Sequence, residues 1–266
     1  MLNSLKQFIR IFKSDDFMKN PNAPQISEAD NRALLIGLIN SEQTTSYCNS
    51  LTTGLPRERV LQGLSEAWGV HNPEEAFSIL DWILNEGHRV IYNEVLPVLK
   101  TQNAKNIKEN IFQIFNEKFQ QMAERVERQE DLEEIKEKIE HQLGRAIEFV
   151  DNLTECIKGR GNDDFVAFND ENMAKGILAW DLGRLVTVSR LASDAGFIDE
   201  STAWDYIRKG YQMAIQEYAT WKDLATAYLI GRGAWGGDTM MLNGLYSIAK
   251  TSIIETESPW NKTSLK

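Results

Sequence analysis

The sequence predicts an all-α fold, a multi-helix globular domain that carries a long charged helical hairpin. Strand patterns are nearly absent from the 266 residues, whereas apolar residues recur at spacings of three and four. Residues that start and stop helices punctuate the chain repeatedly. The composition agrees with a folded domain, because 42% hydrophobic and 9% aromatic residues supply a core.

We expect residues 1–102 to form an N-terminal helical region. Apolar residues at helical spacing between positions 2 and 12 predict a short helix that docks on its own domain rather than on a membrane surface. Ser27, followed three residues later by Asp30, has the form of a capping box. The polar stretch 40–53 is expected to separate this helix from the next one.

Two further helices of this region have clear starts. One has Pro56 in its first turn, where proline is well tolerated, and ends near Trp68. The other follows Asn72, which can cap it, and Gly87 can close it in a left-handed conformation.

Residues 103–160 are expected to form the charged hairpin. Apolar residues from Ile107 to Val126 form one helical stripe, and those from Leu132 to Ile157 form another. The densely charged run between them is either the tip of a hairpin or the exposed waist of one long helix. The similar lengths of the two stripes favour the hairpin, and the charges are typical of a solvated face.

Residues 161–266 are expected to form a C-terminal helical region that carries the AWDLGR and GRGAW motifs. A glycine-rich break at 159–164 precedes it. We expect helices over about 171–195, after Asp199, after Thr220 and over about 239–250. The glycines of 231–237 should end the third helix in a flexible loop that allows close approach, and the polar tail should fray.

Three charged residues of this region lie on apolar helix faces. Asp181 and Arg184 are three residues apart, beside Trp180, so their side chains can meet. They form either a buried ion pair that fixes the helix, or a site in which Arg184 faces an anionic ligand and Asp181 orients it or acts as a base. Arg232 either binds the last carbonyls of its helix or provides a second cation over the same cavity.

Aromatic residues and one histidine complete the set of candidates. Five of the seven tryptophans lie in the last third of the chain, a pattern typical of a core and also of binding-site rims. His88 and Arg89 follow the predicted helix stop, where a histidine is usually a capping or core residue. The tryptophan candidates are Trp180, Trp204, Trp221 and Trp235.

Several classes of function are disfavoured. The sequence contains no HExxH, no paired Glu-x-x-His, no P-loop, no GxGxxG after a strand and no GxSxG, so we expect no metal site and no cofactor. The net charge of −10 disfavours nucleic-acid binding. Cys48 and Cys156 are expected to be buried and reduced, and the lack of an apolar run long enough to span a membrane suggests a cytoplasmic protein.

Six sequence blocks follow one another along the chain: AWGV (67–70), WILNEGHRV (82–90), AWDLGR (179–184), GFIDESTAWDYI (196–207), TW (220–221) and LIGRGAW (229–235). Together they resemble an uncharacterised bacterial family, domain of unknown function 1266. The family has no established activity, so the resemblance implies only where a site lies. The matching positions are Trp82, Gly87, His88, Arg89, Trp180, Asp181, Arg184, Trp204, Trp221, Gly231, Arg232 and Trp235.

We expect the function to be that of a protein-interaction module. The acidic balance, the helical build and the missing catalytic motifs favour it. One form is an immunity-type protein that masks the active site of a basic toxin, in which case the partner is a basic protein.

The alternative is an enzyme or a binder of a small anionic ligand. Asp181 would then be a base or an orienter, Arg184 and Arg232 an anion clamp, and His88 an acid or base. This requires all four groups to meet at one cavity, and a separation of His88 and Arg184 above about 12 Å would exclude it. A third hypothesis is that the motif only holds helices together.

Overall fold

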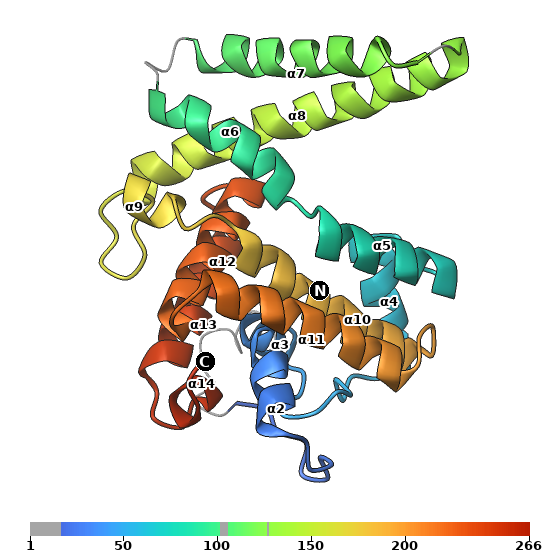
Figure 1. The fold of residues 1–266 in the computed structure, drawn as a ribbon. Helices are drawn as coiled ribbons and strands as arrows, with labels where there is room; N and C mark the ends of the chain where they lie inside the picture. The colour runs from blue at the N-terminus through green and yellow to red at the C-terminus, as the bar shows by residue number, and fades with distance from the viewer. Residues whose placement is uncertain (1–16, 102–105, 127) are drawn as a thin grey trace.

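The computed structural model describes residues 17–101, 106–126 and 128–266, and every regular element within these ranges is a helix (Figure 1). The predicted all-α fold is therefore confirmed. The helix expected between positions 2 and 12 lies outside the described residues. The helices are α2 (Glu28–Leu35), α3 (Leu38–Thr44), α4 (Arg57–Trp68), α5 (Pro73–Asn85), α6 (Arg89–Thr101), α7 (Ile107–Ala123), α8 (Gln129–Arg160), α9 (Asp170–Met173), α10 (Leu178–Ala195), α11 (Glu200–Glu217), α12 (Trp221–Gly236), α13 (Met240–Ile254) and α14 (Pro259–Lys262).

The predicted helix starts are confirmed at four N-caps. In each of them a side-chain oxygen accepts a hydrogen bond from the backbone N–H three residues later, which satisfies a free donor of the first turn. The caps are Ser27, Asn72, Asp199 and Thr220. The two cysteines are buried and free, as expected. No helix in the described part of the chain is both long and apolar enough to cross a membrane.

Helix α10 is the centre of the fold. It packs against α3, α4, α5, α11 and α12, and Figure 1 shows it between α12 and α5. Most of its residues are buried, including the charged Asp181, Arg184 and Arg190. A helix that is covered on all sides can carry charges only where they are satisfied. The partners of these three residues therefore determine which elements α10 holds in place.

Arg190 fixes the loop that follows α3. Its guanidinium donates hydrogen bonds to the backbone oxygens of Leu51 (3.0 Å), Tyr47 and Thr52 (3.1 Å), and to the hydroxyl of Ser41 (2.9 Å). This arginine is not among the residues that sequence patterns pointed to. Its four acceptors attach α3 and the following loop to α10, and so hold one wall of the pocket described below.

The predicted hairpin is confirmed by α7 and α8, which pack against each other and project from the rest of the molecule (Figure 1). Helix α8 is 32 residues long. Beyond the hairpin it continues to pack against α6 and α12, so the same helix belongs to both the projection and the body. The division into three regions at 102 and 160 stays a prediction.

Two expectations about glycines were wrong. The helix expected over 171–195 is interrupted at Gly176, whose φ of 71° is left-handed, and α9 and α10 lie on either side of it. The stretch 231–237, expected to be a loop, continues α12 as far as Gly236. Glycine disfavours a helix by only about 1 kcal/mol relative to alanine, and tertiary packing outweighs this cost here.

Two polar segments also differ from expectation. The tail does not fray, because Trp260 of α14 stacks on Trp221, with ring centroids 5.2 Å apart and an interplanar angle of 8°. The Trp260 Nε1–H donates to the backbone oxygen of Leu35 at 2.9 Å. The stretch 40–53 is partly helical, since α3 extends to Thr44. Both segments are held by partners far away in sequence, which local patterns do not reveal.

Gly231 allows α12 to approach α10 closely. A methyl group added at this position would lie 2.4 Å from Cβ of Trp180 and 3.0 Å from Cβ of Ile177. Carbon atoms in contact need about 3.5–4.0 Å. Glycine at 231 is therefore required for the pairing of the helices that carry Arg184 and Arg232.

We expect Gly231→Ala to lower the free energy of unfolding by about 1–3 kcal/mol, because the added methyl group overpacks the contact between α10 and α12. Gly144→Ala on α8 is the matched control, since nothing lies within 4 Å of its added methyl group. The control should raise the free energy of unfolding by about 0.5–1 kcal/mol. Urea unfolding followed by circular dichroism measures both. A Gly231→Ala variant as stable as the wild type would contradict the close approach of the two helices.

Candidate functional site

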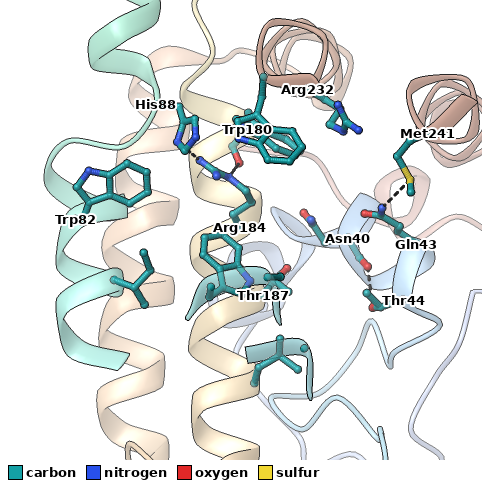
Figure 2. Close-up of a pocket in the computed structure, with 16 residues that line it drawn as sticks. Asn40, Gln43, Thr44, Trp82, His88, Trp180, Arg184, Thr187, Arg232 and Met241 are labelled. Carbon is teal, nitrogen blue, oxygen red and sulfur yellow. Dashed lines mark hydrogen bonds between the residues drawn. The ribbon is translucent and has the colours of Figure 1, made fainter. Parts of the chain in front are cut away.

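A pocket of about 780 Å³ lies beside α10. Its walls come from α3, α4, α5, α10, α12 and α13, together with the turn between α5 and α6. Among the described residues that line it there is no aspartate or glutamate. Figure 2 shows its side chains, and those that determine its chemistry are Trp68, Trp82, His88, Trp180, Arg184 and Arg232.

Asp181 lies behind the pocket, and its carboxylate is fully buried. Oδ1 accepts hydrogen bonds from the backbone N–H of His88 (3.1 Å) and from Nη2 of Arg184 (2.5 Å). Oδ2 accepts from the backbone N–H (3.1 Å) and from Nη1 (3.1 Å) of Arg89. One carboxylate is thus bound by two guanidinium groups and by two backbone N–H groups at the start of α6.

Arg89 extends this cluster to the end of α5. Besides Asp181, its guanidinium binds the backbone oxygens of Ile83 (2.8 Å) and Leu84 (2.7 Å) in the last turn of that helix. A cation at this position complements the free carbonyls of a helix C-terminus. The pair of Arg89 and Asp181 therefore joins α5, α6 and α10.

Gly87 makes the approach of the carboxylate possible. Its φ of 64° is in the left-handed region that favours glycine. A methyl group at this position would lie 2.3 Å from Oδ2 of Asp181. The turn between α5 and α6 can place two backbone N–H groups on Asp181 only because this residue lacks a side chain.

Arg184 connects the buried cluster to the pocket. The residue is 6% exposed, and its side chain lines the wall of the pocket. Nε donates to the backbone oxygen of Trp180 (3.2 Å), and Nη2 binds Asp181 and lies 3.2 Å from Nδ1 of His88. The guanidinium carbon lies 4.7 Å from the ring centroid of Trp180 and 5.4 Å from that of Trp68. Two indole rings therefore fix this cation.

The turn after α5 places His88 next to Arg184 (Figure 2). The imidazole packs edge-to-face on Trp82 at 5.1 Å and stacks on Phe149 at 6.1 Å. Burial, and secondarily the charge of Arg184, lowers the pKa of His88 from 6.5 to about 2. The ring is therefore neutral at pH 7, and its Nδ1 accepts the hydrogen bond from the guanidinium.

Arg232 is 8% exposed and lines the same pocket from α12. Within 17–101, 106–126 and 128–266 it forms no ion pair, and its buried Nη1 has no hydrogen-bond partner. The guanidinium carbon lies 5.0 Å from the ring centroid of Trp235. Burial lowers the pKa of Arg232, but an arginine side chain stays protonated in proteins. The pocket wall thus contains a buried cation with no balancing carboxylate.

The predicted candidates occupy three places. Asp181 and Arg89 form the cluster behind the pocket, whereas Trp204 and Trp221 lie elsewhere, packed against Arg208 and Trp260. The candidates that line the pocket are His88, Trp180, Arg184, Arg232 and Trp235.

The pocket also contains residues that sequence reasoning missed. Asn40, Gln43 and Thr44 come from α3, in the stretch expected to separate helices, and Met241 comes from α13. Nε2 of Gln43 contacts Sδ of Met241 at 3.3 Å. One available signal was the polar Asn40 at the end of an otherwise apolar run, where a buried amide is unusual.

A family model described as protein of unknown function (DUF1266) matches residues 63–265. This range contains all six sequence blocks, so the resemblance found from the sequence is confirmed. The range also includes the charged segment 103–160, which carried none of the blocks. No curated protein and no solved structure matches the chain.

Asp181→Asn should lower the free energy of unfolding by about 3–5 kcal/mol, because it leaves two buried guanidinium groups without a balancing charge. Urea unfolding at pH 7.5 measures the loss. Asp131→Asn is the control, since the pair of Asp131 and Arg128 is exposed and should contribute little. A loss below about 1 kcal/mol for Asp181→Asn would mean that the cluster does not organise the fold.

The stability of the protein should also depend on pH through His88. The unfolded chain protonates this residue below about pH 6.5, whereas the folded protein keeps it neutral down to about pH 2. The free energy of unfolding is therefore expected to fall between pH 6.5 and 5, with a slope approaching about 1.4 kcal/mol per pH unit. His88→Asn, which retains an acceptor for Arg184, should show a flatter profile in the same urea titrations. Parallel profiles would argue against a buried neutral imidazole.

Proposed function

We propose that this chain, which belongs to the family described as protein of unknown function (DUF1266), binds a small anionic ligand in the pocket beside α10. The observation that carries the proposal is Arg232, a buried guanidinium in the pocket wall without a carboxylate partner among the described residues. An uncompensated buried charge costs several kcal/mol. An anion that enters from solution would remove this cost.

The other buried arginines provide the contrast. Arg190 has four acceptors, and Arg89 and Arg184 share the carboxylate of Asp181. These side chains satisfy their charge or hydrogen bonds inside the protein. Arg232 differs from them because no carboxylate among the described residues pairs with it and its Nη1 has no hydrogen-bond partner.

The size and walls of the pocket support the same proposal. A volume of about 780 Å³ falls in the range of 300–1,000 Å³ that is typical of small-molecule sites. Aromatic rings line it, and a few polar groups converge within it. Although the chain as a whole has a net charge of −10, the charged side chains lining the pocket within the described residues are cations. Such a concave cationic surface concentrates anions.

The geometry favours binding over acid–base catalysis. Asp181 accepts four hydrogen bonds behind the pocket, so it orients Arg184 rather than taking a proton from a ligand. His88 is neutral at pH 7, so it is no acid there, and its low pKa and the hydrogen bond from Arg184 to its Nδ1 also make it a weak base. The proposed site therefore uses Arg184 and Arg232 as binding groups.

A protein-interaction function, in the immunity-type form with a basic partner, stays a prediction from composition. The same holds for a cytoplasmic location. Neither conflicts with a small-ligand site, because the pocket occupies only part of the surface.

Arg232→Met tests the proposal through two measurements. We expect the ligand-free variant to be more stable than the wild type by about 1–3 kcal/mol in urea unfolding, because methionine fills the space without a buried charge. Inorganic phosphate should raise the unfolding temperature of the wild type above that in chloride of equal ionic strength. The variant should lose this phosphate-dependent increase.

Arg208→Met is the matched control for this experiment. Its guanidinium is half exposed and already paired with Asp30 on the outside of the molecule. The phosphate effect should persist in the control. A phosphate effect of equal size in Arg232→Met and in the wild type would refute the proposed site.

A further inference from the structure

We infer that the ligand of this pocket is a planar aromatic molecule that carries a doubly charged anionic group. An aryl phosphate and an aromatic dicarboxylate both have this chemistry. The inference rests on the proposed function and names the class of ligand.

The charge follows from the balance of buried groups. Asp181 binds both Arg89 and Arg184, so one negative charge faces two positive ones. Arg232 adds a third positive charge without a partner in the described chain. His88 contributes no charge at pH 7. Two positive charges thus remain to be balanced, which a dianion does and a monoanion does not.

The two pocket arginines, Arg184 and Arg232, act on one buried group. The hydroxyl of Tyr228 is buried where α10 and α12 meet, and burial raises its pKa while the charges of Arg184 and Arg232 oppose this shift. The two guanidinium groups therefore lie close enough to influence the same buried atom. Both guanidinium groups also line the same pocket, so an anion bound there would be attracted by both.

Two residues that line the pocket carry buried donors without a partner within the described chain. Nε1 of Trp180 is buried without an acceptor in the part of the chain that the structure describes, as is Nη1 of Arg232. The indole of Trp180 is 6.2 Å from that of Trp235, over which Arg232 lies. An indole N–H can only donate, and guanidinium groups have no acceptor. Phosphate and carboxylate oxygens are the acceptors that suit such a set.

The wall formed by α4 and α5 contains two indole rings and an aliphatic side chain. Trp68 from α4 and Trp82 and Ile79 from α5 line this side. Figure 2 shows Trp82 on the opposite side of Arg184 from Asn40 of α3. Aromatic rings bind other rings in offset or edge-to-face geometry, with a gain beyond the area they bury. The ligand is therefore expected to place a ring here and its charges toward Arg232.

Calorimetric titration of the full chain at pH 7.5 with four probes tests the class. Phenyl phosphate is expected to bind at least tenfold more tightly than inorganic phosphate, which lacks the ring, and than benzoate, which lacks the second charge. Phthalate, an aromatic dicarboxylate, distinguishes a ligand with two carboxylates from one with a phosphate group. If phthalate binds more tightly than benzoate and phenyl phosphate does not, the ligand is a dicarboxylate. If phenyl phosphate binds more tightly than benzoate and phthalate does not, the ligand is a phosphate monoester.

Variants of the pocket separate the contribution of the ligand's ring to binding from that of its charge. Trp82→Leu should weaken phenyl phosphate at least tenfold and leave inorganic phosphate unchanged, whereas Arg232→Met should weaken both. Trp204→Leu on α11 is the matched control, since Trp204 lies outside the pocket, and it should change neither. If Trp82→Leu does not fold, Trp82→Phe reduces the same aromatic wall and leaves the rings that contact Arg184 in place.

The pH dependence provides an independent measure of ligand charge. The titratable and charged side chains that face the pocket in the described chain are His88, Arg184 and Arg232, and none of them changes charge between pH 7.5 and 5. The second pKa of a phosphate monoester is about 6, so the dianion falls to about a tenth at pH 5. Phenyl phosphate should therefore bind about tenfold more weakly at pH 5, and benzoate should not.

The outcomes distinguish the two levels of the proposal. Equal affinities for phenyl phosphate and inorganic phosphate would overturn the aromatic part. Equal affinities for benzoate and both dianions would overturn the double charge, and anion binding itself would stand. If no probe binds and Arg232→Met has no effect on phosphate, the proposed function fails as well.

Discussion

The buried carboxylate of Asp181 determines how the helices around α10 are arranged. It holds the first backbone N–H groups of α6, and through Arg89 it also reaches the last carbonyls of α5. The same charge positions Arg184, and the turn it fixes carries His88. Removing one partner of such a cluster would leave the others buried and unpaired, so its members depend on one another. The wall of the pocket is thus built on an interaction that lies behind it.

The buried arginines have two different roles, one in holding the fold together and one in the proposed binding site. The guanidinium groups of Arg89 and Arg190 act inside the protein, where backbone oxygens fix their positions. Arg184 belongs to both systems, because it binds Asp181 and also lines the pocket. The hypothesis that the sequence motif only holds helices together therefore describes Asp181 and Arg89 well. It does not account for Arg232, whose charge has no carboxylate partner and whose Nη1 has no hydrogen-bond partner among the described residues.

Local patterns in the sequence predict the helices but not most of their contacts. Caps such as Asn72 and the spacing of Asp181 and Arg184 are features of a single helix, so they could be recognised directly. The contact between Asp181 and Arg89 spans 92 residues, and no spacing rule reaches that far. The glycines of 231–237 were misjudged because they allow close packing within the fold, as Gly231 does against α10 and Gly233 against Cys156 of α8. Tertiary packing also explains α3, which supplies pocket residues from a stretch that appears unstructured in sequence.

If an anion binds beside Arg232 as proposed, the stability of the protein depends on the counter-ions of its solution. Chloride, sulfate and phosphate preparations would be different salt forms of one chain, each with the anion that its dialysis history left in the pocket. Unfolding temperatures measured in two buffers would then differ because the two anions bind the folded protein with different affinities, even though the fold is the same. A reference state for this protein needs a named anion at a stated concentration, as a titration needs a named pH.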